Sequence, residues 1–126
     1  MQVSEDEFYT LVQKAVAEIP ERFAKHLNNV AFLTADVPTP LQQRASGTLH
    51  GRGQVLLGLY EGIPLPRRTG GYSGVVPDVI TVFQNAHEML APNAEVLERM
   101  VHQTVWHEVA HYFGLDHGQI RALERP

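Results

Sequence analysis

The sequence of 126 residues contains no cysteine. This absence excludes disulfide scaffolds, thiolate zinc fingers, iron–sulfur clusters and cysteine nucleophiles. No stretch approaches the ~18 consecutive apolar residues of a membrane-spanning helix. The acidic, polar start also lacks the basic and apolar regions of a signal peptide. We therefore expect a cytoplasmic protein without a membrane partner.

Basic residues are few as well, at 10 against 14 acidic ones, for a net charge of −4. A protein that binds duplex nucleic acid through its phosphates usually carries a basic surface, so we expect no such partner here. The hydrophobic and charged fractions, 44% and 19%, are those of an ordinary globular chain. The length fits one domain over residues 1–126.

The hydrophobic pattern predicts an α+β fold, in which a small mixed sheet of three or four strands packs on helices. Ser4 and Glu7 form a capping box before a first helix with apolar positions from Phe8 to Ile19. Three glycines in residues 41–53 indicate an irregular connection. Strands are expected at residues 30–37, 55–60 and 79–83. The run at 55–60 is apolar on both faces and is therefore predicted to be the central strand. Further short helices are expected at 20–27, 85–90 and 119–124.

The last long helix is predicted over residues 93–113, with Pro92 at its start and Gly114 as its stop. Glycine suits this position because it tolerates the left-handed backbone that ends many helices. The segment 105–113 is apolar almost all round, so this helix is expected to be buried. Its few polar side chains then need partners.

Seven histidines are the unusual feature of the composition, and two of them lie in the motif His107-Glu108-x-x-His111 near the end of this helix. Histidines four residues apart lie on one helix face and can bind one metal ion. Glu108 is turned by about 100° from His107, which places it beside such an ion as a general base for water.

A third metal ligand is expected just after the helix, where Gly114 lets the chain turn back. His117 is our first choice, because three imidazoles and one water make an open, catalytic type of Zn²⁺ site. Asp116 is the alternative third ligand, or else a hydrogen-bond partner of a ligand histidine. The other histidines, His26, His50, His87 and His102, lack ligand spacing to the motif and are expected to be surface or internally hydrogen-bonded residues.

The segment His107–His117 resembles the signature of the zincin metallopeptidases, in the longer form shared with metzincins. Leu56–Leu65, Pro77–Phe83 and the motif helix are also similar to a family of small bacterial zincin-like metallopeptidases. The resemblance implies a minimal zincin fold, one zinc ion per chain and peptide-bond hydrolysis with Glu108 as the base. Aspartate often stands in that family where this chain has His117. No methionine follows His117, so the methionine turn of metzincins is absent.

By the same resemblance, a peptide or protein substrate would lie antiparallel to an edge strand, formed by residues 79–83 or 55–60. The loop 61–77 is a candidate lid, and its Tyr72 is a weak candidate for stabilising the oxyanion.

Two other functions stay open. The bacterial rRNA-maturation endonucleases have a similar size and a His-x₃-His-x₅-His spacing that ends in an Asp-His pair, as Asp116-His117 does here. They usually have glycine where this chain has Glu108, and the acidic charge balance also disfavours a phosphate backbone as substrate. The third possibility is a zinc-binding or interaction protein without catalysis.

Overall fold

The computed structural model describes residues 1–50, 55–63 and 77–115, with the side chains of 46–50 left out. It confirms the predicted α+β class. In chain order, the elements are α1 (Glu5–Ala17), α2 (Glu21–Ala24), β1 (Val30–Ala35), α3 (Pro40–His50), β2 (Gly58–Glu61), β3 (Asp78–Phe83), α4 (Gln84–Leu90) and α5 (Ala94–Tyr112).

The three strands form one mixed sheet with the order β1-β3-β2. β3 lies in the centre, parallel to β1 and antiparallel to β2. The prediction that residues 55–60 form a central strand is therefore wrong, and residues 79–83 are not an edge. The run at 55–60 is apolar for another reason: Leu56 is buried before the strand begins, and Gly58 faces a helix.

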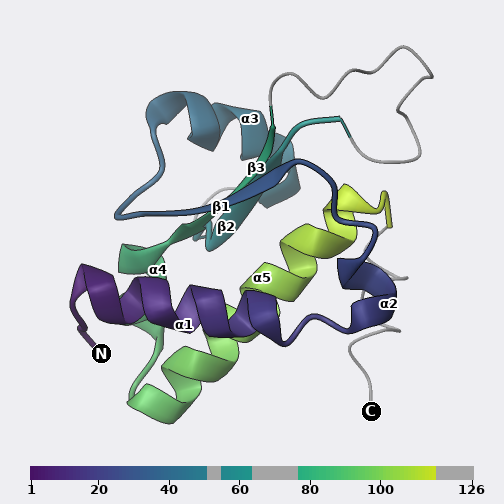
Figure 1. Ribbon diagram of the computed structural model, residues 1–126. Coiled ribbons are helices and arrows are strands. Elements are labelled where there is room, and N and C mark those ends of the chain that lie inside the picture. The colour runs from purple at the N-terminus through teal and green to yellow at the C-terminus, as the bar shows by residue number, and fades with distance from the viewer. Residues whose placement is uncertain (51–54, 64–76, 116–126) are drawn as a thin grey trace.

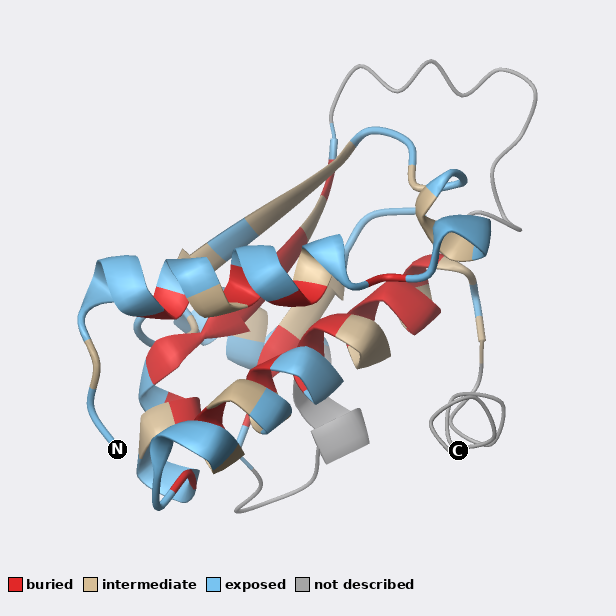
Figure 2. Cartoon of the chain, turned by 60° about the horizontal axis from the view of Figure 1, so that its bottom comes forward, coloured by how far each residue is buried: buried red, intermediate tan, exposed pale blue. Residues whose placement is uncertain are grey.

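The helices α1 and α5 lie on one side of the sheet, and α3 lies on the other (Figure 1). Buried residues concentrate where α1, α5 and the sheet meet (Figure 2). This core contains Phe8, Val12, Ala15, Ile19, Ile80, Val82, Ala91, Leu97, Val101, Val105 and Val109. Burying side chains of this size contributes about 1.5–3 kcal/mol each, so the core fixes α5 firmly against its neighbours.

The ends of the main helices follow the expected chemistry. The Glu7 amide donates to Ser4 Oγ over 3.0 Å, which confirms the capping box of α1. Asn93 caps α5 by accepting from the Val96 amide at 2.9 Å. Gly114 has a φ of 74°, and the Leu115 amide reaches back to the Ala110 carbonyl, so α5 ends in the left-handed turn predicted for it.

The irregular connection predicted for 41–53 is wrong over most of its length, because α3 occupies Pro40–His50. The Gln42 amide donates to Thr39 Oγ1 at 3.1 Å, while Gln42 Oε1 accepts from the Thr39 amide at 2.9 Å. This reciprocal pair is a capping box followed by proline at the first helical position, both of which start helices. Together they outweigh the cost of Gly47 inside the helix.

In the part of the chain that the structure describes, no helix has the length and hydropathy needed to cross a membrane.

Candidate active site

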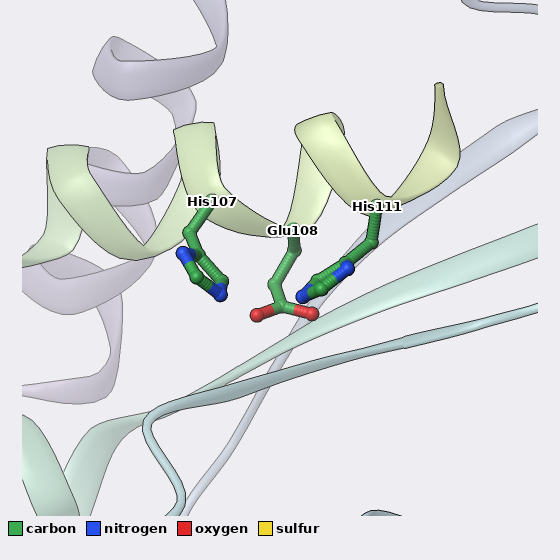
Figure 3. A group of neighbouring side chains, drawn as sticks. All are labelled: His107, Glu108 and His111. Carbon is green, nitrogen blue, oxygen red and sulfur yellow. The ribbon is translucent and has the colours of Figure 1, made fainter. Parts of the chain in front are cut away.

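The last two turns of α5 carry His107, Glu108 and His111, which point toward one another (Figure 3). One ring nitrogen of each histidine and one carboxylate oxygen of Glu108 lie within 4.8 Å of each other. The two imidazole rings stand edge to face, with centroids 4.8 Å apart. Both histidines are half-buried, whereas Glu108 is buried. The spacing of the motif thus produces the cluster that it predicts.

This donor set fits a zinc ion. Neutral imidazoles are common zinc ligands, and a catalytic site needs three protein ligands and one open position. Ligand atoms about 2 Å from a tetrahedral ion are roughly 3.3 Å apart, so small side-chain rotations close a cluster of this spread around an ion. His107 and His111 are therefore suited to supply two of the ligands.

Glu108 lies in a buried stripe of α5, together with Thr104 and Tyr112, at four-residue spacing. Its Oε1 accepts a hydrogen bond of 2.9 Å from the backbone amide of Tyr60 in β2. Burial raises the pKa of Glu108 to about 7, because the charged form loses its hydration, while the Tyr60 amide acts in the opposite direction. Glu108 is thus oriented by the strand and holds a proton far more readily than an exposed carboxylate.

A cleft of about 370 Å³ opens between β2 and α5 next to the cluster. Its walls include Leu57 and Gly58 on one side and Met100, Gln103 and His107 on the other. Because β2 is an edge strand, this cleft adjoins the border of the sheet. Glu108 itself lines this cleft, so the cleft opens directly beside the carboxylate.

Tyr112, which lies inside the motif, has a structural role. Its ring is fully buried and its hydroxyl donates to the His26 carbonyl at 3.1 Å. The same hydroxyl accepts from the Asn28 amide at 3.1 Å. Tyr112 therefore ties the end of α5 to the chain that leads into β1.

Several predicted site residues lie outside the described residues. They are the third-ligand candidates His117 and Asp116, the oxyanion candidate Tyr72, and most of the predicted loop 61–77. Their roles stay predictions.

One contributor near the site was not predicted, and a second, His87, was expected only as a surface or internally hydrogen-bonded residue. The Tyr60 amide was missed because a backbone group of another element leaves no mark in the motif. His87 is fully buried with both ring nitrogens bonded, one of them to Thr104 of α5. No local pattern marks it, since half of the other residues of α4 are polar.

Comparison with known proteins agrees with this geometry. A family model described as a zincin-like metallopeptidase matches residues 27–125. The chain belongs to the zincin-like metallopeptidase family. The family implies a zinc cofactor, for which the cluster on α5 offers ligands.

One solved structure supports the fold independently. A conserved hypothetical protein from Thermus thermophilus matches 88% of this chain and 94% of its own length, with a TM-score of 0.58 and 24% sequence identity. At this identity the likeness shows the fold alone. The comparison with curated proteins found no match.

Proposed function

We propose that this chain is a zinc-dependent peptidase in which His107 and His111 bind the metal and Glu108 is the general base. His117 is the proposed third ligand, with Asp116 as the alternative. The observation that supports the proposal best is the cluster itself: two imidazoles and one buried carboxylate whose ligand atoms lie within 4.8 Å. A bound zinc ion supplies Lewis-acid chemistry, by polarising a carbonyl group and making water more acidic.

The chain's own contribution to the proposed reaction comes from Glu108. In the metal-free chain, burial raises the pKa of this carboxyl group to about 7. As a general base it would accept a proton from water and later give it to a leaving amine. A cation held by the neighbouring imidazoles lowers this pKa, since an opposite charge favours the carboxylate. The bond from the Tyr60 amide holds the carboxylate in one orientation during both transfers.

The proposed substrate is an extended peptide that pairs with the outer edge of β2. This edge strand contributes Gly58 to one wall of the cleft, while its Tyr60 amide is already bonded to Glu108 and is not used for the pairing. Main-chain hydrogen bonds to an edge strand align a peptide whatever its sequence, and the cleft then receives a side chain. Of the two strands considered from the sequence, β2 is the one at an edge, and it adjoins Glu108.

The decisive experiment combines metal analysis with the Glu108→Gln variant, which removes the base and keeps the shape of the side chain. We expect the wild-type protein to carry about one zinc ion and to cleave members of a peptide library. We expect Glu108→Gln to keep the zinc and to lose ~10²–10⁴-fold in kcat. Glu98→Gln is the matched control, because Glu98 is an exposed carboxylate on the same helix.

Four outcomes would contradict parts of the proposal. Loss of zinc from Glu108→Gln would make Glu108 a ligand, and full activity of that variant would exclude it as the base. Cleavage of single-stranded RNA instead of peptides would favour the endonuclease. A protein that binds zinc tightly and cleaves neither would be a binding module.

A further inference from the structure

His87 is a polar residue in the middle of the core. Its side chain is fully buried and lies against the Phe8 ring, with centroids 5.6 Å apart. Nδ1 is 2.7 Å from the Phe83 carbonyl oxygen, and Nε2 is 2.8 Å from Thr104 Oγ1. An apolar side chain would fill this space without the cost of removing a polar ring from water. The two hydrogen bonds therefore require an explanation beyond packing.

The two bonds fix the proton on the ring. A carbonyl oxygen only accepts, so Nδ1 carries the hydrogen of the neutral imidazole. Burial lowers the pKa of His87 and so favours this neutral form. Nε2 is then an acceptor, and the Thr104 hydroxyl donates to it. Thr104 Oγ1 also lies 3.0 Å from the Met100 carbonyl oxygen, and because the hydroxyl has a single hydrogen, these two acceptors share it. Both distances belong to the same rotamer of Thr104, which His87 and the helix therefore favour together.

This rotamer aims the methyl group of Thr104 at the edge strand. A Cβ added to Gly58 would stand 2.6 Å from Thr104 Cγ2 and 3.3 Å from Glu108 Cγ. The strand β2 thus rests against α5 at Thr104 and Glu108, as closely as a glycine allows. Two residues along the strand, the Tyr60 amide donates to Glu108. A change in the spacing at Gly58 is therefore passed to the hydrogen bond that orients the carboxylate.

We propose that His87 and Thr104 are a positioning pair that sets the spacing between α5 and β2 and so holds the Glu108 carboxylate on the Tyr60 amide. His87 touches neither the metal-binding cluster nor the cleft and acts only through Thr104. The pair bears on catalysis only if the proposed function holds, but the geometry that it sets is present without any reaction.

The test compares two substitutions of Thr104. Thr104→Val keeps the branched shape and removes the hydroxyl, whereas Thr104→Ser keeps the hydroxyl and removes the methyl group. The main readout is the amide proton resonance of Tyr60 in the folded protein, which lies downfield when it is bonded to a carboxylate. We expect it to move upfield in both variants, because Thr104→Val loses the hydrogen bond that fixes the rotamer and Thr104→Ser loses the methyl group that meets β2. In peptide hydrolysis we expect Thr104→Val to lose about 10-fold or more in kcat with little change in KM.

Val101→Ala is the matched control, because Val101 is a buried residue of α5 that belongs to the core and not to the pair. It lowers stability but is expected to leave the Tyr60 resonance in place. If Val101→Ala moves the resonance as far as Thr104→Val does, or if Thr104→Val leaves it unchanged, the positioning pair is refuted. His87→Phe provides a second variant should Thr104→Val fail to fold, with the same expected upfield shift. A wild-type chain that cleaves nothing would refute the proposed function, while the Tyr60 resonance would still decide on the pair.

Discussion

Burial and one hydrogen bond act on the Glu108 side chain in opposite directions, and burial dominates. The outcome is a carboxyl group that ionises near neutral pH in the metal-free chain. Its position next to two imidazoles gives this property a use, because a group that exchanges protons near pH 7 is suited to acid–base chemistry.

A first prediction at this scale concerns the stability of the metal-free protein. The pKa of Glu108 is about 7 in the folded chain and 4.5 in its ordinary environment, so between these values the folded chain binds more protons than the unfolded chain. The free energy of unfolding contributed by this group therefore falls as pH rises from about 4.5 to about 7, by up to ~3 kcal/mol. Urea unfolding in a chelating buffer, across this range, measures the effect.

The Glu108→Gln variant should lack this part of the pH dependence and gain relative stability toward neutral pH. Glu98→Gln serves as the control, since Glu98 is exposed and paired with Lys14 at the surface. Parallel pH curves for the wild type and Glu108→Gln would show that Glu108 is not buried as described.

The residues of the motif were predictable from the sequence because they lie within one helical turn of each other. His107, Glu108 and His111 needed only the geometry of a helix to be placed together. The partners of Glu108 and Thr104 come from β2 and α4, far away in the chain, and only tertiary packing brings them there. No local pattern encodes a contact between the Tyr60 amide and a carboxylate of another element.

At the scale of elements, α5 is positioned by its two faces. One face packs through apolar residues on α1 and on the central strand β3. The other face brings Thr104 and Glu108 against the edge strand β2. Gly58 is the closest point of this second contact. A glycine is required there for lack of space between strand and helix, not for an unusual backbone angle.

We therefore predict that Gly58→Ala weakens the packing of β2 on α5. Its new Cβ would stand 2.6 Å from Thr104 Cγ2, whose rotamer is fixed by hydrogen bonds. Forcing an extra methyl group into a tight contact costs about 1–3 kcal/mol, which chemical denaturation would measure.

The double variant Gly58→Ala, Thr104→Ser should recover part of this loss, because serine lacks the methyl group that the alanine meets. A mutant cycle of the two single variants and the double variant gives the coupling. Strictly additive effects would mean that the two side chains do not collide.

The start of α1 and the end of α5 were predicted from explicit end signals in the sequence, whereas a signal of the same kind at α3 was missed. Ser4 with Glu7 starts α1, and Gly114 ends α5, as expected. The same signal at Thr39 and Gln42 starts α3, but the glycines that follow indicated a connection instead. The position of β2 in the sheet could not be predicted, since an apolar run is compatible with a centre or an edge and pairing alone decides.

At the scale of the whole molecule, a small core positions one helix whose end carries the candidate metal ligands. A ligand that binds only the folded chain stabilises it by mass action. For the proposed zinc site, the stabilisation is about 2.7 kcal/mol when free zinc is 100-fold above its dissociation constant.

Added zinc is accordingly predicted to raise the melting temperature of the wild type, in a concentration-dependent way, and to have little effect on His107→Ala. His102→Ala is the matched control, because His102 is an exposed histidine of the same helix. The same zinc titration of His117→Ala and Asp116→Ala identifies the third ligand. It is the residue whose substitution removes more of the rise in melting temperature. Equal shifts in the wild type and His107→Ala would contradict the site.

The place of β3 in the sheet has a consequence for how the chain folds. In the described residues, β1 and β2 pair only with β3, which follows both of them in the sequence. A chain emerging from the ribosome therefore holds two unpaired strands until β3 arrives between them. The helix that carries the site comes later still, so Glu108 meets the Tyr60 amide only after the sheet has closed. The contact on which the proposed chemistry depends is therefore absent until α5 has been synthesised.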